Sequence, residues 1–292
     1  MNIDLIPGVI VLNNPIVTTA WLERNLDNKK LILLDASMSK IVGKKPIVYT
    51  EAKFIPHSRR FDLEEVFCDL ASAQNNAFPS PEHFTREARK LGINTDSLVV
   101  IYDNQGIYSS PRAWWIFQAM GFKNAVVLNG GLPQWLEEKR PTVSALSNKS
   151  IKLGNINGFY QQALVCDAHY VLQSLPQHTS SIVDARSAMR FSGQAPEPRA
   201  GVRSGHIPKA LSLPFAEILD IHCFKSQQQL TEIFSKLGIQ KNTQAIFTCG
   251  SGITACIIML AAHIAGMTKT SLYDGSWADW GSNQSLPIEK HE

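Results

Sequence analysis

The segment "IFTCGSGITACI" (residues 246–257) places a thiol where it can act as a nucleophile. A short apolar run ends at Cys249, the glycine loop "GSG" follows, and residues that can open a helix begin near Thr254. This order of residues fits three chemistries. The thiol can be a nucleophile, the loop can hold a nucleotide phosphate, or the whole can be an inert turn.

The loop after Cys249 favours an ionised sulfur. Gly250 and Gly252 lack a Cβ, so the backbone can curl closely around a bound group. Successive N–H groups can then form an anion-binding nest, and the start of the following helix adds partial positive charge. Such surroundings favour the thiolate, which is the nucleophilic form of cysteine. A free cysteine is also a common small core residue, so the loop alone leaves an inert thiol open.

Two phosphate-binding interpretations are weaker. The stretch "GSGITA" (250–255) fits the dinucleotide pattern G-x-G-x-x-A, and Asp274 follows about 20 residues later, as that fingerprint requires. However, little chain follows Asp274 to build the rest of a dinucleotide crevice. Cysteine-dependent phosphatases clamp phosphate with an arginine after the loop, and Ala255 stands at that position. We therefore favour the nucleophile.

The chain resembles itself at long range. The stretch "FTREARKLGINTDSLVVIYD" (84–103) matches "LTEIFSKLGIQKNTQAIFTC" (230–249), an offset of 146 residues. "LILLDAS" and "SSIVDARS", "FIPHSRRFD" and "HIPKALSLPF", and "VVLNGGLPQW" and "TSLYDGSWADW" match at similar offsets. This spacing indicates a tandem duplication rather than a short-period solenoid.

Each repeat predicts an α/β fold. Continuously apolar runs such as 98–102 and 245–248 alternate with helix-length segments, which indicates a mostly parallel sheet with helices on both faces. Ligands bind such sheets beyond the carboxyl ends of the strands. Asp103 and Cys249 both fall there, so the duplication predicts a silent first copy and an active second copy.

Composition excludes several classes of function. The chain has 292 residues, 44% of them hydrophobic, which suits one large domain or two of ordinary size. A net charge of +3 gives no strong attraction to nucleic acid or membrane. The first residues lack the basic region of a signal peptide, and no apolar run is long enough to span a bilayer. We expect neither nucleic acid nor membrane as a partner.

The cysteines indicate a reducing compartment. There are five, an odd number, and no two of them form a C-x-x-C pair, so neither a disulfide framework nor a zinc site is predicted. We expect a cytoplasmic protein without a metal or other cofactor.

Taken together, "CGSGITA", "VDARSAMRFSGQAPEPRAGVRSGHIPKALSLPF" and "DGSWADWG" resemble the 3-mercaptopyruvate sulfurtransferases of the rhodanese superfamily. The resemblance covers nearly the whole chain. It implies two tandem rhodanese-like domains, each a mostly parallel five-stranded sheet flanked by helices. We expect an inactive domain at 1–142, a polar linker at 143–158 and a catalytic domain at 159–292.

The resemblance also implies roles for individual residues. Cys249 matches the cysteine that forms a persulfide, and Ser251 matches a loop serine that assists proton transfer. Asp62 matches an acidic residue that joins this serine in a relay, and Arg190 and Arg199 match two arginines that hold the substrate. The remaining loop residues match the substrate-binding loop: Gly250, Gly252, Ile253 and Thr254. Departures from the family pattern are Phe54, Arg59 and Arg60 in the first repeat and Lys209 in the second.

The residues at the loop bear on the sulfur donor. Thiosulfate-specific relatives carry two cations beside the thiol, whereas this chain has Gly250 and Ser251. A carboxylate-bearing donor instead needs cations at the pocket wall, where Arg190 and Arg199 can serve. The resemblance therefore implies transfer of sulfur from 3-mercaptopyruvate to a thiol such as thioredoxin or glutathione, or to cyanide, with release of pyruvate. The alternatives are a thiosulfate sulfurtransferase and a non-catalytic sulfur-carrier module.

Overall fold

The computed structural model describes residues 4–6, 9–11, 14–74, 76–146, 151–177 and 180–290. The chain divides into two compact units. The first comprises residues 1–69, 78–161 and 221–224, and the second comprises residues 70–77, 162–220 and 225–292. Residues 70–77, from the first half of the sequence, therefore belong to the second unit, and residues 221–224, from the second half, belong to the first unit.

The first unit is built on a five-stranded parallel sheet. The strands lie in the order β3-β7-β6-β4-β5, and every neighbouring pair is parallel. Their bounds are β3 (Ile16–Val17), β4 (Leu31–Asp35), β5 (Arg59–Arg60), β6 (Leu98–Tyr102) and β7 (Ala125–Leu128). The helices are α1 (Thr19–Asn25), α2 (Pro81–Lys90), α3 (Ser110–Ala119) and α4 (Gly131–Glu137).

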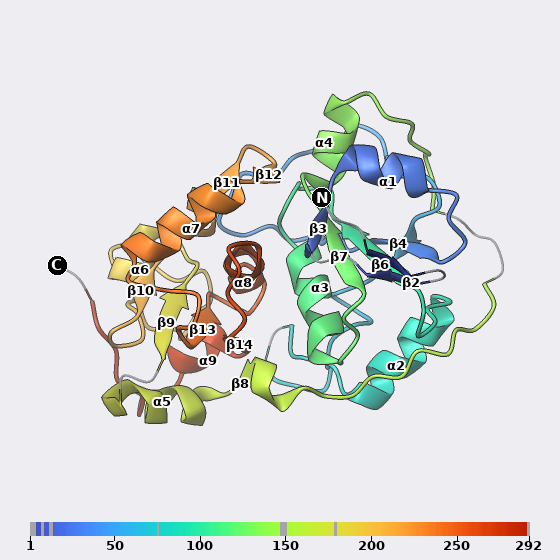
Figure 1. The fold of residues 1–292 in the computed structure, drawn as a ribbon. Coiled ribbons are helices and arrows are strands. Elements are labelled where there is room, and N and C mark those ends of the chain that lie inside the picture. The colour runs from blue at the N-terminus through green and yellow to red at the C-terminus, as the bar shows by residue number, and fades with distance from the viewer. Residues whose placement is uncertain are drawn as a thin grey trace. The chain divides into compact units, whose positions relative to one another are not determined.

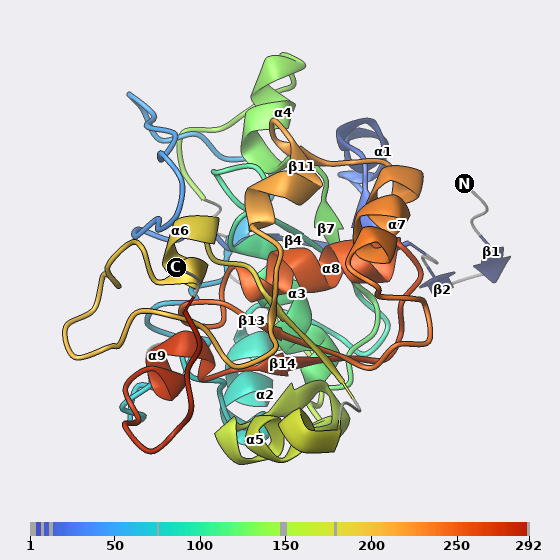
Figure 2. The same ribbon diagram turned by 90° about the vertical axis from the view of Figure 1, so that its left-hand side faces the viewer.

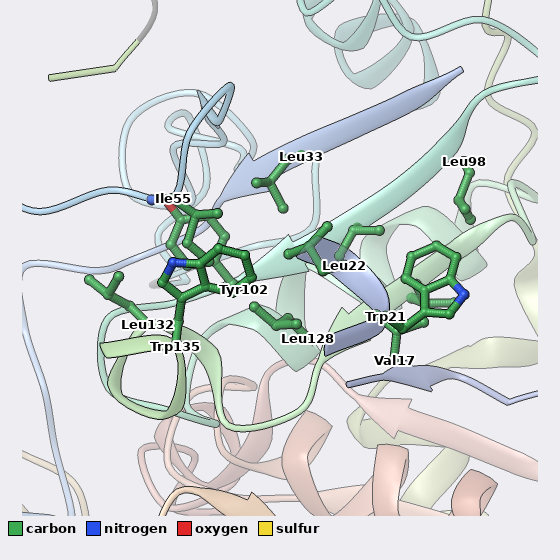
Figure 3. Packing of buried hydrophobic residues seen from close by; sticks show 12 residues of the cluster. Val17, Trp21, Leu22, Leu33, Ile55, Leu98, Tyr102, Leu128, Leu132 and Trp135 are labelled. Carbon is green, nitrogen blue, oxygen red and sulfur yellow. The ribbon is translucent and has the colours of Figure 1, made fainter. Parts of the chain in front are cut away.

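Burial on both faces explains why the central strands are apolar throughout. All five residues of β6 are buried. One face packs under α1 and α4, where Trp21, Leu33, Leu128 and Trp135 share one core cluster (Figure 3). Helices α2 and α3 lie on the other side of the strands (Figure 1). There Phe84 and Phe117 pack edge to face, with ring centroids 5.3 Å apart.

The second unit repeats this architecture. Its parallel sheet has the order β10-β9-β13-β14-β8. Starting from β8 here and from β3 in the first unit, both sheets have the same order of strands along the chain: first, fifth, fourth, second and third. The strands are β8 (Val165–Cys166), β9 (Ser181–Asp184), β10 (Leu211–Ser212), β13 (Ala245–Thr248) and β14 (Thr270–Tyr273). The helices are α5 (Ala168–Gln177), α6 (Ala188–Ser192), α7 (Gln227–Lys236), α8 (Ala255–Ile264) and α9 (Ser276–Trp280).

Helix α8 is the central helix of the second unit. Nine of its ten residues are buried, so it is apolar nearly all round, as a helix enclosed by protein must be. It packs against β13 and β14, with α5 on the opposite side of these strands (Figure 2). Its first residue follows the loop that begins at Cys249. The shorter elements are β1 (Asp4–Ile6), β2 (Val9–Val11), β11 (Leu219–Asp220), β12 (Cys223–Phe224) and the 3-10 helices η1 (Gln162–Leu164) and η2 (Phe215–Ile218).

The predicted fold class, two parallel five-stranded sheets flanked by helices, is confirmed. Of the predicted linker 143–158, residues 147–150 lie outside the described residues, and the described parts, 143–146 and 151–158, group with the first unit. The domain boundaries stay a prediction. The predicted lack of a signal peptide concerns the first residues, of which 1–3, 7, 8, 12 and 13 lie outside the described residues. Among the described helices, none has the length and apolar character to cross a bilayer.

Candidate active site

Cys249 stands at the carboxyl end of β13, with the loop 250–254 between it and α8. The cysteine is 2% exposed. Gly252 adopts a left-handed conformation with φ of +77°, which turns the chain into the helix and favours glycine at this position. Within the described residues, the amide N–H groups of Gly250, Ser251, Ile253 and Thr254 donate no hydrogen bond. These donors are available to an anion.

The segment after β14 fixes the cysteine loop. The amide of Trp277 donates to the carbonyl of Cys249 at 2.9 Å, and that of Ala278 donates to the carbonyl of Gly250 at 3.0 Å. The amide of Cys249 donates to Ser276 Oγ at 3.2 Å, and this hydroxyl in turn donates to the carbonyl of Tyr273 at 2.9 Å. The backbone on either side of the thiol is thus held by the start of α9.

Arg190 lies directly against the cysteine loop. A Cβ atom added at Gly250 would sit 3.0 Å from Arg190 Nη2 and 3.8 Å from Nη1. A Cβ at this position would therefore make a tight contact with the guanidinium, which glycine avoids. The cation comes from α6, not from the loop itself.

A buried carboxylate orients this arginine. Glu197, whose side chain is 3% exposed, accepts hydrogen bonds from Arg190 Nε at 3.2 Å and from Nη2 at 2.5 Å. It also accepts from Arg186 Nη1 at 2.8 Å. Arg186 is itself paired with Asp184 through Nε and Nη2. Burial opposes the charge of Arg186, but the carboxylates of Asp184 and Glu197 raise the pKa of this guanidinium above its usual range.

This arrangement leaves one edge of Arg190 available. Glu197 takes the edge formed by Nε and Nη2. The other edge, formed by Nη1 and the second hydrogen of Nη2, lies toward Gly250. Within the described residues, Nη1 makes no hydrogen bond. Two coplanar N–H groups of a guanidinium are the geometry that binds a carboxylate in a bidentate manner.

The hydroxyl of Ser251 is oriented by a residue from the first half of the sequence. Asn76, within a stretch of the second unit, donates from Nδ2 to Ser251 Oγ at 3.3 Å. Because Oγ accepts here, its own hydrogen can point elsewhere. The neighbouring Gln74 donates to Asp274 Oδ2 at 2.9 Å, so the stretch 70–77 is anchored on both sides of the cysteine loop.

The matching loop of the first unit holds a carboxylate. At the position that corresponds to Cys249, Asp103 Oδ2 accepts hydrogen bonds from the amides of Tyr108, Ser109 and Ser110 at 2.9–3.0 Å and from the Ser110 hydroxyl at 2.6 Å. The amide of Gln105 donates to Oδ1 at 2.9 Å. This unit therefore shows that the loop and helix start close around an anion.

In the second unit, two of the equivalent amide donors have no hydrogen-bond partner among the described residues. With the offset of 146 residues, Ser251 and Thr254 correspond to Gln105 and Tyr108. Their amides are among those without a partner in the described part of the chain. Cys249 stands at the position of Asp103, and free backbone N–H groups of this kind can donate to an anion.

Two of the predicted site residues are not brought to the loop by any contact within the second unit. Arg199 lies half-buried in the segment between α6 and β10 and makes no hydrogen bond or ion pair with a described residue. Asp62 belongs to the first unit, where its Oδ1 accepts from the amides of Glu64 and Glu65. Their roles in the reaction stay predictions.

The other buried cysteines are suited to the core rather than to catalysis. Burial raises the pKa of the Cys166 thiol to about 12, and burial likewise raises that of Cys68. Cys256 is fully buried, and its Sγ donates to the carbonyl of Gly252 at 3.2 Å. His206, the histidine of the segment "GHIP", is buried with its Nδ1 2.8 Å from the carbonyl of Phe191 and its ring stacked on that side chain.

Comparison with known proteins fits this geometry. Residues 18–138 and 167–283 each match the family described as rhodanese-like domain, so the chain belongs to the rhodanese family and carries two copies of its domain. It is 33% identical to a 3-mercaptopyruvate sulfurtransferase from Escherichia coli, covering 92% of this chain and 95% of the relative. It is also 33% identical to the mitochondrial thiosulfate/3-mercaptopyruvate sulfurtransferase 1 of Arabidopsis thaliana, covering 96% of this chain and 79% of the relative.

The fold is likewise similar to that of a solved relative. The crystal structure of SseA from Escherichia coli, described as a 3-mercaptopyruvate sulfotransferase with the rhodanese fold, superposes with a TM-score of 0.79 at 30% identity. The match covers 90% of this chain and 99% of SseA. The tandem repeat inferred from the sequence corresponds to two copies of the rhodanese-like domain.

Sequence reasoning missed three residues that shape the site. Glu197 sits in the quoted segment "PEPR", and an acid between two candidate arginines was a signal that it could pair with one of them. Ser276 lies in the quoted "DGSW", where its hydroxyl partner could not be foreseen. Asn76 carried no signal, because it lies in the first half of the chain.

Proposed function

We propose that this chain is an enzyme that transfers sulfur from 3-mercaptopyruvate to a thiol or to cyanide through a persulfide on Cys249, releasing pyruvate. The observation that carries the proposal is the free edge of Arg190 beside Gly250. It offers a bidentate site for a carboxylate next to a cysteine whose loop amides can hold an anion.

In the first half-reaction the Cys249 thiolate attacks the thiol sulfur of the donor. A sulfur–sulfur bond forms and the carbon–sulfur bond breaks, with its electron pair passing to carbon as the enolate of pyruvate. The proton of the donor thiol ends on that carbon, and we assign its relay to Ser251, whose Oγ accepts a hydrogen bond from Asn76. Arg190 stabilises the charge that develops on the donor, and the loop amides stabilise the persulfide anion.

In the second half-reaction an acceptor attacks the outer sulfur of the persulfide. A thiolate such as that of thioredoxin or glutathione leaves as a new persulfide, and cyanide leaves as thiocyanate. Either step returns Cys249 as the thiolate, so the kinetics are expected to be ping-pong. Asp62 and Arg199 are the further groups that we assign to proton relay and substrate binding. The free state of all five cysteines supports a cytoplasmic setting.

Mass spectrometry of the intact protein and of its peptides tests the proposal. After exposure to 3-mercaptopyruvate, the peptide that contains residue 249 should gain one sulfur atom, and Cys249→Ser should neither gain it nor form pyruvate. Thiosulfate, offered in parallel, should load the protein less efficiently as judged by kcat/KM. Equal or better loading by thiosulfate would assign the chain to the thiosulfate-specific class. Loading without turnover would make it a sulfur carrier.

A further inference from the structure

A donor-lined cavity of about 500 Å³ lies entirely within the first unit. It is formed between the start of β4, the start of β5, the loop after α2 and residues 151–152. All of its lining residues belong to one unit, and Cys249 is not among them. The sulfur-transfer chemistry proposed above does not use it.

Positive charge dominates the walls of this cavity. Four cationic side chains line it, Lys29, Lys30, Arg59 and Lys152, against the single carboxylate of Asp96. Lys30 Nζ is paired with Asp96 at 3.0 Å. Lys29, Arg59 and Lys152 have no carboxylate partner within the described residues. Three positive charges therefore face the cavity without compensation.

Arg59 is the centre of this cluster. It lies on β5, is partly buried, and donates from Nη1 to the carbonyl of Leu91. Burial lowers the pKa of this guanidinium, because no carboxylate offsets the loss of water around it. The next residue points elsewhere, since Arg60 lies 3.8 Å from Asp35 and 3.9 Å from Asp62 and does not line the cavity. An uncompensated, partly buried arginine beside a cavity is the arrangement expected where an anion binds.

The remaining lining decides the kind of anion. Asn94 also lines the cavity, and its Nδ2 donates no hydrogen bond to a described residue. His57 also lines the cavity and lies 4.0 Å from the exposed Asp27. No phenylalanine, tyrosine or tryptophan is among the described lining residues, so the cavity offers no surface on which a nucleotide base could stack. Several cations around a small volume favour a compact polyanion instead.

We propose that this cavity, with Arg59, Lys29 and Lys152 at its wall, is a binding site for a compact polyanion that carries at least two phosphoryl groups. Each phosphoryl group can accept charge-assisted hydrogen bonds from the arginine fork or a lysine ammonium. A single phosphate engages fewer of these donors than two linked ones. A ligand of this class would stabilise the first unit, because it binds the folded cavity and not the unfolded chain.

Calorimetric titration of the full chain with inorganic pyrophosphate at low ionic strength tests the proposal, with inorganic phosphate as the second probe. We expect one pyrophosphate site, weaker binding of phosphate, and loss of affinity as sodium chloride is added. Arg59→Gln should weaken pyrophosphate binding about tenfold to a hundredfold, which corresponds to one lost charge-assisted contact. The matched control, Arg60→Gln, removes the same charge one residue away and should leave the affinity within about twofold.

Several results would overturn this site. They are no binding of pyrophosphate by the wild-type chain, an unchanged affinity in Arg59→Gln, or equal losses in the Arg59 and Arg60 variants, which would indicate only a diffuse effect of surface charge. Thermal unfolding shows whether Arg59→Gln remains folded. If it does not, Lys29→Gln, at an exposed position, takes its place with the same expected direction and the same refuting result.

Discussion

Replacing Arg190 by lysine removes the free guanidinium edge while keeping the charge. In the wild-type chain, Glu197 holds the Nε and Nη2 atoms, and the other edge lies toward Gly250. A lysine can still pair with Glu197 through its ammonium group, but it cannot present two coplanar N–H groups to a carboxylate. Glu197 keeps its contact with Arg186, so the buried carboxylate is not left unpaired.

The size of the effect follows from the contact that is lost. A hydrogen bond to a charged group is worth about 1.5–3 kcal/mol. Because about 1.4 kcal/mol corresponds to a factor of ten, kcat/KM for 3-mercaptopyruvate should fall about tenfold to a hundredfold. The fall in kcat/KM should be smaller with thiosulfate, because thiosulfate has no carboxylate that could bind to the guanidinium edge. The thermal midpoint should change little, because the lysine keeps the positive charge that pairs with Glu197.

Steady-state release of pyruvate measures this effect directly, with thiocyanate formation from thiosulfate and cyanide as the parallel assay. Arg203→Lys is the matched control, since Arg203 donates only to carbonyl groups, such as those of Gly281 and Leu286. That variant should lower the thermal midpoint but keep kcat/KM. If Arg190→Lys turned over 3-mercaptopyruvate within about twofold of the wild-type rate while remaining folded, the bidentate role of Arg190 would be refuted.

Three further predictions concern stability. Asp103→Ala leaves the buried amide donors of its loop without an acceptor and should destabilise the first unit by about 3 kcal/mol or more in urea denaturation; a change below about 1 kcal/mol would show that these bonds matter little. Ser276→Ala removes the acceptor of the Cys249 amide and should cost about 1–3 kcal/mol together with a lower kcat, and an unchanged kcat would mean that the Ser276 hydroxyl does not position the cysteine for the reaction. Burial lowers the pKa of His263 from 6.5 to about 4, so the unfolded chain binds a proton at this residue more readily than the folded chain does. The free energy of unfolding should therefore decrease as the pH falls from about 6.5 through 4. His263→Gln should flatten this slope in thermal unfolding between those pH values, and a slope equal to that of the wild type would assign it to other groups.

The fold was predictable because its signals are local and occur twice. The apolar runs that become β6 and β13 are buried along their whole length, so their composition alone indicates strands covered on both faces. The offset that aligns Asp103 with Cys249 also predicts two copies of one topology, and both sheets have the same strand order. Local composition and long-range repetition therefore gave the same answer.

The contacts that organise the site were less predictable because they join segments far apart in sequence. The exchange of short stretches between units, such as 70–77 into the second unit, leaves no periodic signal. Asn76 consequently could not be connected with Ser251. Likewise, a motif shows that Glu197 and Arg190 are near each other along the chain, but only the three-dimensional arrangement shows which edge of the guanidinium is engaged.

The carboxylate that fills the loop of the first unit has a consequence for the reaction cycle. The Asp103 side chain accepts the hydrogen bonds of its own loop, so these donors have an acceptor at every stage of the reaction. In the proposed reaction, Cys249 completes an equivalent ring with a side chain that gains one sulfur atom and loses it again in every turnover. We therefore expect the cysteine loop of the second unit to exchange its amide hydrogens more slowly when Cys249 carries the extra sulfur than when it does not. The matching loop of the first unit should not change, so it can serve as an internal reference in hydrogen-exchange measurements.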